Sequence, residues 1–259
     1  MKKGGRHVEH TVQIEEAVVE LSLDWLIGKV RIHQHDHSYI LIHQITNNAF
    51  PRRHLLQYQV REGRLVIQDR RKRKFSLGLH LHKTDLEIYL PQKQIQSMSI
   101  HCKGANLHLD GLRMEEVKCQ LTSGKAMFTG DIKHLRLQTV GGLISSQQLI
   151  TQTLELRTTS SKVEMVGAFS DIDLHATGRR IQIDSITMLH SLKSTTTGAD
   201  VKLAIPENDG FSCYVKKRSG VFQNDFPCVG EKENKVHKNG QKTFEIDIRG
   251  GQFRLSETH

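Results

Sequence analysis

The chain has 259 residues, enough for one large β domain or two ordinary domains, and its formal net charge of +9 favours polyanionic partners. Aromatic residues make up only 5% of it, which argues against a binder of single-stranded nucleic acid. No run of 18 apolar residues is present, so we expect no transmembrane span.

Residues 1–17 form a polar N-terminal segment that we expect to fray. They lack the apolar core of a secretory signal, so the sequence predicts a protein that is cytoplasmic or peripherally associated with the cell envelope. No Pro-rich or Gly/Ser-rich linker interrupts residues 18–258, which we interpret as one β-repeat domain. Its parts are N-terminal strands with a capping hairpin (18–91), six core repeats (92–206), and C-terminal strands with an exposed loop and a closing repeat (207–258).

Within the N-terminal part, apolar residues alternate on both sides of Gly28 and match one repeat unit. Next, His33, His35 and His37 alternate, so one strand face would carry three imidazoles, a pattern that can chelate Zn²⁺, Ni²⁺ or Cu²⁺. The 16 histidines are scattered over the chain, however, and this run also suits a solvated loop or sheet edge. We therefore predict no metal and no cofactor. Further histidines nearby in the sequence are His43, His80 and His82.

A hairpin is predicted around the turn Glu62-Gly63, because apolar residues alternate on both sides of it. The densest basic run of the chain follows the hairpin. Five like charges repel each other, which predicts an exposed loop. Such a loop could be a solvated connector, or it could contact anionic lipid headgroups or an anionic polymer. The run consists of Arg70, Arg71, Lys72, Arg73 and Lys74.

Residues 95–206 repeat one pattern six times with a period of about 19 residues. Each copy places Gly or Ser at a turn and an apolar residue three positions later. The turn anchors are Gly104, Ser123, Gly141, Ser160, Gly178 and Gly198. The positions three residues later hold Leu107, Ala126, Ile144, Val163, Ile181 and Val201, and those four residues earlier hold Ile100, Cys119, Leu137, Leu156, Leu174 and Ser194.

Alternating apolar residues on both sides of each anchor indicate two short β-strands per unit, each with one buried face. A single unit cannot bury that face alone, so the fixed period predicts stacked units. The sequence therefore predicts an all-β protein, a β-solenoid or parallel β-helix-like superhelix with two sheets. An antiparallel meander or sandwich would show the same alternation and is the alternative.

If the units stack in register, Glu155 and Asp173 occupy one outward column, about 5 Å apart. A carboxylate pair at this spacing could serve retaining glycoside hydrolysis. Basic residues surround the pair, which favours a charge ladder on a sheet face over catalysis. We predict no catalytic residues and no enzyme. The flanking basic residues are Arg136, Arg157, His175 and Lys193.

Beyond Pro206, residues 211–215 read as a strand, and residues 231–242 are polar and Lys-rich, which predicts an exposed loop. Residues 244–255 repeat the unit pattern around a Gly-Gly turn. Cys213 and Cys228 flank a loop and could form a disulfide in an oxidising compartment.

Several of these segments resemble a bacterial β-strand repeat family of putative adhesins, formally a domain of unknown function. The family alternates an apolar strand, a Thr-Ser-Ser-Gly-type turn and a second strand, as residues 154–163 (LELRTTSSKV) and 195–201 (TTTGADV) do here. Residues 86–91 (LEIYLP) are similar to its strand-plus-Pro entry, and residues 244–255 to its last repeat. The resemblance implies a two-sheet superhelix related in shape to pectate-lyase-like β-helices, without established catalytic residues.

We therefore predict a non-enzymatic scaffold or binding module of putative-adhesin type at the cell envelope. Its expected partner is a protein, an anionic polymer or a lipid surface, and not a specific nucleic acid. An envelope-stress regulatory component, suggested by the resemblance, and a polysaccharide-acting β-helix enzyme are the alternatives.

Overall fold

The computed structural model describes residues 7–47, 50–71 and 84–258 and shows an all-β protein, as predicted. Within these residues, the helical structure is confined to the short 3-10 helix η1 (Arg52–His54), and no helix has the length and apolarity of a membrane span. The strands are β1 (His7–Ile14), β2 (Glu20–His35), β3 (Ile40–Asn47), β4 (Gln57–Arg61), β5 (Arg64–Gln68), β6 (Asp85–Pro91), β7 (Ser97–Thr122), β8 (Lys125–Val140), β9 (Leu143–Thr159), β10 (Lys162–Thr177), β11 (Arg180–Ser185), β12 (Ser191–Thr197), β13 (Ala199–Ile205), β14 (Gly210–Asn224), β15 (Asn234–Lys238) and β16 (Lys242–Glu257).

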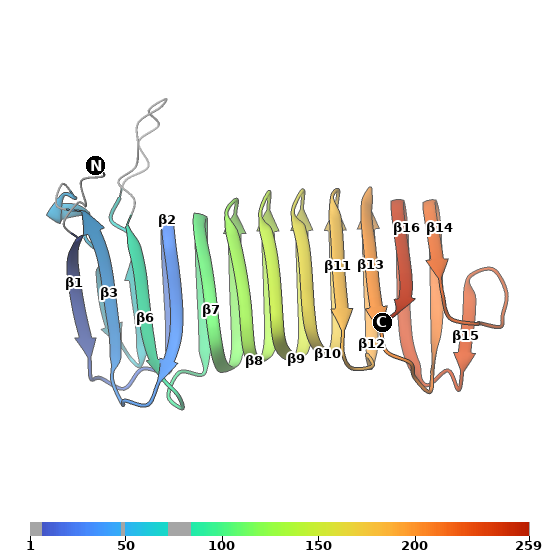
Figure 1. Cartoon of the computed structure of the whole chain (residues 1–259), viewed down its shortest axis with the longest axis horizontal. Helices are drawn as coiled ribbons and strands as arrows, with labels where there is room; N and C mark the ends of the chain where they lie inside the picture. The colour runs from blue at the N-terminus through green and yellow to red at the C-terminus, as the bar shows by residue number, and fades with distance from the viewer. Residues whose placement is uncertain (1–6, 48–49, 72–83, 259) are drawn as a thin grey trace, which may run out of the picture.

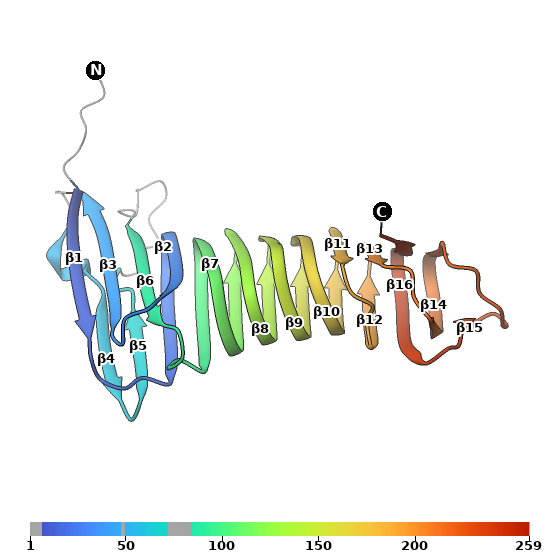
Figure 2. The ribbon, with the colours of Figure 1, turned by 60° about the horizontal axis from the view of Figure 1, so that its bottom comes forward.

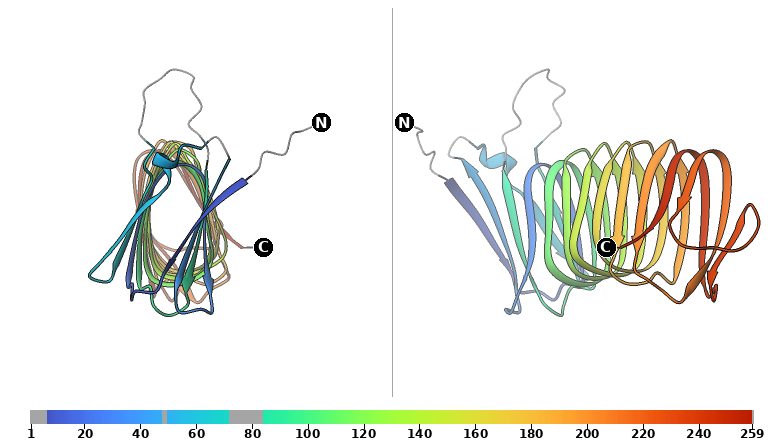
Figure 3. Two further views of the ribbon diagram at one scale, coloured as in Figure 1. Left: turned by 90° about the vertical axis from the view of Figure 1, so that its left-hand side faces the viewer. Right: turned by 45° about the vertical axis from the view of Figure 1, so that its right-hand side comes forward.

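The strands stand side by side along one elongated, solenoid-like stack (Figure 1). From β2 to the first part of β14, the neighbouring strands are parallel, which confirms the predicted parallel arrangement. Seen from its end, the stack is a flattened ring with two long sides (Figure 3). We call the side that holds residues 135–139 and 153–158 the first side, and the side that holds residues 143–146 and 162–165 the second side.

Each unit passes from the first side to the second at its anchor turn, so the anchors line one narrow edge of the ring, here called the anchor edge. The opposite narrow edge, where the chain returns to the first side, is the return edge. Outward side chains of the two sides and the two edges make up most of the surface of the central stack.

Strand pairing aligns the central units along the stack. Residues three positions after successive anchors pair with one another across the parallel strands, and so do residues four positions before them. The first column is Leu107, Ala126, Ile144, Val163, Ile181 and Val201. The second column includes Cys119, Leu137, Leu156, Leu174 and Ser194.

The anchor turns adopt a backbone conformation that explains their Gly and Ser residues. Five of the six anchors have φ between 51° and 67°, the left-handed region in which glycine is unstrained. Successive turns are also joined along the stack: the Gly141 N–H donates to the Thr159 carbonyl oxygen (3.0 Å), and the Ser160 N–H donates to that of Thr177 (2.9 Å). The turns thus continue the sheet hydrogen bonding around the edge.

The interior is one continuous apolar cluster that runs from Val12 to Leu255. It is thin, because each layer contributes only the inward side chains of its two short strands. Its largest fully buried side chains include Trp25, Phe128, Phe169, Phe211, Phe244 and Phe253.

At the N-terminal end, the expectation that residues 1–17 fray is wrong for residues 7–14. These form β1, which pairs antiparallel with β3, and both Val12 and Ile14 are buried. Polar residues around this segment obscured its short alternation of apolar residues in the sequence. The predicted hairpin is present as β4 and β5, with its turn at Glu62-Gly63, and β5 also lies parallel to β2 (Figure 2).

At the C-terminal end, two expectations are corrected. Half of the loop expected at 231–242 is strand β15, which pairs antiparallel with β14 and buries His237. The repeat expected to close the stack, β16, is an inner layer: it lies between β13 and β14 on the second side and between β12 and β14 on the first (Figure 1). The outermost parallel layer is β14, which precedes β16 in the chain.

Candidate ligand-binding face

Three outward columns run along the first side near the anchor edge, one residue per layer. Because the strands pair in register, each column aligns side chains that are about 19 residues apart in the sequence. The first column holds Lys118, Arg136, Glu155, Asp173, Lys193 and Glu245. The second holds Gln120, Gln138, Arg157, His175, Thr195 and Asp247, and the third holds Thr122, Val140, Thr159, Thr177 and Thr197.

The carboxylate of Glu155 is held between two guanidinium groups. Arg136 Nε lies 2.5 Å from Oε2, and Arg157 Nε lies 2.9 Å from Oε1. Desolvation raises the pKa of Glu155, but hydrogen bonds and charge interactions with the two arginines outweigh it, so the pKa lies below its usual range. Glu155 therefore stays ionised at neutral pH.

Asp173 neighbours Glu155 in the predicted column but has a partner of its own. Its Oδ1 lies 3.1 Å from His175 Nε2. The two carboxylates thus contact different partners, as expected of a charge ladder across a sheet face.

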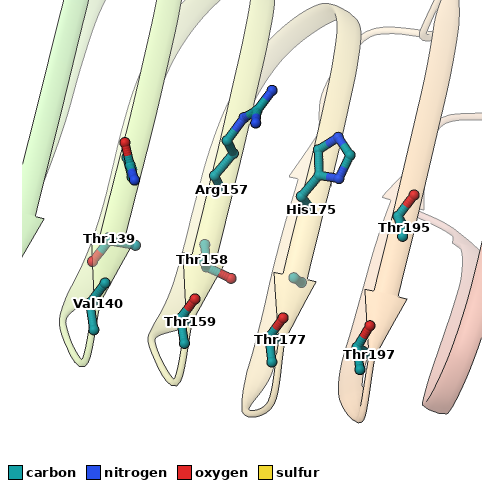
Figure 4. A pocket seen from close by; sticks show the side chains of 11 residues that line it. Thr139, Val140, Arg157, Thr158, Thr159, His175, Thr177, Thr195 and Thr197 are labelled. Atoms are coloured by element: carbon teal, nitrogen blue, oxygen red, sulfur yellow. The ribbon is translucent and has the colours of Figure 1, made fainter.

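Two shallow hollows adjoin on this side, because Gln138 and Arg157 line both of them. One, of about 480 Å³, lies over the ladder between Lys118 and Arg157. The other, of about 290 Å³, lies nearer the anchor edge (Figure 4). Figure 4 shows Thr159, Thr177 and Thr197 at the same height on successive strands, below Arg157, His175 and Thr195.

The two hollows present hydroxyl, amide and guanidinium groups, and the smaller one exposes few apolar atoms. Hydroxyls both donate and accept hydrogen bonds, an amide side chain does the same, and a guanidinium donates several. The threonine hydroxyls recur with the strand spacing of about 4.8 Å. This face can therefore hydrogen-bond a polar ligand that extends along the stack. Strand pairing brings these residues together on one face. In the sequence, only the repeat period indicated that they would align.

The histidine run lies at the N-terminal end of the second side, where the rings form an aromatic cluster. His33 stacks on Tyr89 (centroids 5.5 Å apart), and His37 stacks on Tyr39 (5.1 Å), with His35 edge-on to His37. His33 Nδ1 also lies 3.2 Å from Asp110. Within the described ranges, no three His, Cys, Asp or Glu side chains lie where they could hold a metal ion. The candidates His80 and His82 lie outside the described residues.

The basic run differs from the expected exposed loop at Arg71. Arg71 is buried: its guanidinium pairs with Asp69, donates to the Ile27 carbonyl oxygen (2.7 Å) and lies 5.3 Å from the Trp25 ring centroid. Arg71 thus serves the interior, while Arg70 is exposed. The other three residues of the run, Lys72, Arg73 and Lys74, lie outside the described residues.

All four cysteines are free thiols in the structure, including Cys213 and Cys228. Cys102 and Cys119 face inward. Desolvation raises the pKa of Cys119 to about 12, so this thiol stays protonated and behaves as a small apolar residue.

A family model, Toastrack DUF4097, matches residues 19–256, almost the whole chain. The chain belongs to this family. No curated protein matches it.

Solved structures share the fold of this DUF4097 chain at low sequence identity. A putative adhesin from Parabacteroides distasonis is 14% identical with a TM-score of 0.61, covering 97% of this chain and 98% of its own. A putative adhesin from Parabacteroides merdae is 11% identical (TM-score 0.60), and a putative lipid binding protein from Parabacteroides distasonis is 10% identical (TM-score 0.58). Each of these two covers 97% of both chains.

Proposed function

We propose that this protein is a non-enzymatic binding module of the cell envelope that holds an extended polysaccharide along its first side. The observation that carries the proposal is the pair of adjoining hollows, in which hydroxyl and amide groups recur at the layer spacing. A polymer lying along the stack would meet similar donors and acceptors at every layer. Many individually weak hydrogen bonds would then add up along its length.

We base the proposed envelope location on the descriptions of the solved structures that share this fold. The similar structures are a putative lipid binding protein and putative adhesins, and both descriptions concern surfaces. We further propose that the chain is a two-sheet β-solenoid of about 19-residue repeats whose N-terminal end is capped by the β4–β5 hairpin. A capped scaffold would present its long sides as the binding surfaces.

The surroundings of Glu155 argue against its acting as the acid in glycoside hydrolysis. Retaining hydrolysis needs one carboxyl group to be protonated when it acts as the acid. Arg136 and Arg157 keep Glu155 ionised, and Asp173 is paired with His175. An envelope-stress regulatory role is the other alternative, and it is compatible with a polymer-binding face.

The binding site is tested by removing hydroxyl groups without changing side-chain shape. We expect a triple variant, Thr159→Val, Thr177→Val and Thr197→Val, to bind its polysaccharide roughly a hundredfold more weakly, because each lost hydrogen bond contributes about 1 kcal/mol. Retardation in native gels that contain a panel of cell-wall and capsular polysaccharides is the measurement.

The matched control, Thr153→Val, Thr187→Val and Thr243→Val, removes three hydroxyls outside the smaller hollow and should migrate as wild type does. Equal retardation of both variants would refute this site. If no polysaccharide retards the wild-type protein, the proposed ligand class is wrong.

Absence of catalysis is a separate prediction. We expect wild-type protein to release no new reducing ends from the same polysaccharides during long incubation. Reproducible release that disappears in the double variant Glu155→Gln, Asp173→Asn would establish the enzyme alternative instead.

A further inference from the structure

The two narrow edges of the stack carry opposite charge. Among the described residues of the central repeats, the anchor edge carries five cationic side chains and one acidic side chain, that of Asp200. The five are Lys103, Lys125, Lys162, Arg179 and Arg180. The return edge of the described central repeats carries six acidic residues and two cations, Arg113 and Lys133. The six are Asp110, Glu115, Glu116, Asp131, Asp171 and Asp184.

Three cations of the anchor edge, Lys125, Lys162 and Arg180, lie in one row on the second side, directly after the turns. Lys125 and Lys162 both pair in register with Leu143, which lies between them, and Arg180 follows on the next strand. Lys29 begins the same row at the N-terminal end, where it aligns with Asn106 and then Lys125. The side chains of Lys29, Lys125, Lys162 and Arg180 are exposed.

Acidic side chains lie beside part of this row: Asp200 aligns with Arg180 on the next strand, and Asp85 accepts a hydrogen bond from the Lys29 backbone N–H (3.0 Å). Lys162 pairs with Glu164 at 2.7 Å, whereas Lys125, Arg179 and Arg180 form no ion pair with any described residue. Apolar side chains interrupt the row: Val140, 47% exposed, lies just before the Gly141 turn, and Leu143 is half-buried. Cations that flank exposed apolar groups are typical of surfaces that contact lipid headgroups.

The return edge is mostly acidic, and several of its carboxylates form ion pairs or hydrogen bonds with neighbouring side chains. Glu115 pairs with Lys133, Asp171 accepts a hydrogen bond from Ser191 (2.6 Å), and Asp184 accepts one from Gln182 (3.0 Å). The protein therefore has a charge polarity from one narrow edge of the ring to the other, perpendicular to the stack axis.

We infer that the anchor edge docks on an anionic lipid bilayer, with the stack axis parallel to the membrane plane and the return edge pointing away. A negative plane attracts the anchor edge and repels the return edge, so the charge polarity alone would select this orientation. The row runs beside one of the narrow edges of the ring that Figure 3 shows, and a straight row of this kind can lie against a flat surface. A polyanion chain is instead tracked by a basic groove lined with stacking aromatics.

This inference shares Val140 with the smaller hollow but not with the larger one, because the first side stands beside the docked edge. Docking through the anchor edge would leave most of the first side, which carries the charge ladder, exposed to solvent. The larger hollow, between Lys118 and Arg157, lies farther from the anchor edge than the threonine column and would remain accessible. The protein would then display a polymer-binding face next to a membrane.

The test is co-sedimentation with vesicles of phosphatidylcholine alone or mixed with phosphatidylglycerol, at low and high salt. We expect the wild-type protein to bind only the anionic vesicles and to dissociate as salt rises. The triple variant Lys125→Ser, Lys162→Ser, Arg180→Ser should bind them roughly a hundredfold more weakly, because each cation near an anionic surface contributes about 1 kcal/mol.

The control variant Arg113→Ser, Lys133→Ser, Lys193→Ser lowers the net charge by the same amount but leaves the anchor edge intact. It should bind like wild type, and the thermal midpoint of both variants should show that they are folded. An equal loss in both variants would mean that only net charge matters, and it would overturn the inference. So would wild-type protein that ignores anionic vesicles, or that binds soluble polyphosphate but no vesicles.

Discussion

At the scale of single residues, the structure separates two adjacent arginines that look alike in the sequence. Arg71 and Asp69 have side chains that are each 2% exposed, and the Arg71 guanidinium also contacts Trp25 and the Ile27 carbonyl. Arg70 is exposed. Removal of one partner from a buried ion pair leaves the other charge without compensation, which is strongly destabilising.

We therefore expect Arg71→Ala to lower the free energy of unfolding by about 3 kcal/mol. The neighbouring substitution Arg70→Ala should change it by less than about 0.5 kcal/mol. Urea denaturation of both variants measures the difference. Equal stability of the two variants would contradict the buried role of Arg71.

The inward thiols give a pH-dependent prediction at the same scale. Burial raises the pKa of Cys119 to about 12 and that of Cys102 further, so the folded state holds these protons more tightly than the unfolded state does. The stabilisation is complete below the unfolded thiol pKa of about 8.5 and is lost as pH rises above it.

We expect the free energy of unfolding to fall above about pH 8.5, and Cys119→Ala to make this fall less steep, by up to ~1.4 kcal/mol per pH unit. Urea denaturation at a series of pH values is the measurement. Parallel pH curves for variant and wild type would show that the thiol does not contribute.

At the scale of the strands, the inward columns carry the stability of the stack. Ile181 is fully buried between Val163 and Val201, whereas Gln182, the next residue, faces solvent on the same strand. A carboxylate at the inward position would lie in the apolar interior without a partner.

Ile181→Asp should accordingly unfold the protein or lower its free energy of unfolding by more than about 4 kcal/mol, and Leu156→Asp should do the same. The control Gln182→Asp introduces the same group one position away and should cost less than about 1 kcal/mol. Circular dichroism with thermal melting distinguishes them. Equal tolerance of Ile181→Asp and Gln182→Asp would contradict the register.

The strands also show what can be predicted from sequence and what cannot. Within the repeats, the spacing of Ser123, Gly141 and Ser160 determined the register, because each turn resets the two-residue alternation at the same phase. The outward charge ladder followed from that register. The burial of Arg71 did not, because it depends on Trp25, which is 46 residues earlier in the chain. The order of layers at the two ends is equally non-local.

At the scale of the whole molecule, the chain does not add its layers in order. Strand β2, the first parallel strand of the chain, is covered on its outer edge by β5 and β6, which come later. Strand β16, the last strand, is covered by β14, which comes earlier. In both cases a strand near a chain end is enclosed by strands from farther inside the chain.

This order predicts that β16 is more protected than its terminal position suggests. Hydrogen–deuterium exchange should be slower at Phe244 and Ile246 than at Lys235 and Val236 in the outer strand β15, because β16 is paired on both edges. Exchange that is faster in β16 than in β15 would show that the end frays from the chain terminus.

The enclosed position of β16 also limits how such a protein can change its length during evolution. Both edges of β16 are already hydrogen-bonded, so a segment duplicated after residue 258 would find no free strand beside its parent. A unit duplicated between residues 104 and 198 would instead insert between two parallel neighbours of the same shape. Homologues of different length should therefore differ in the number of central repeats and keep the same two ends.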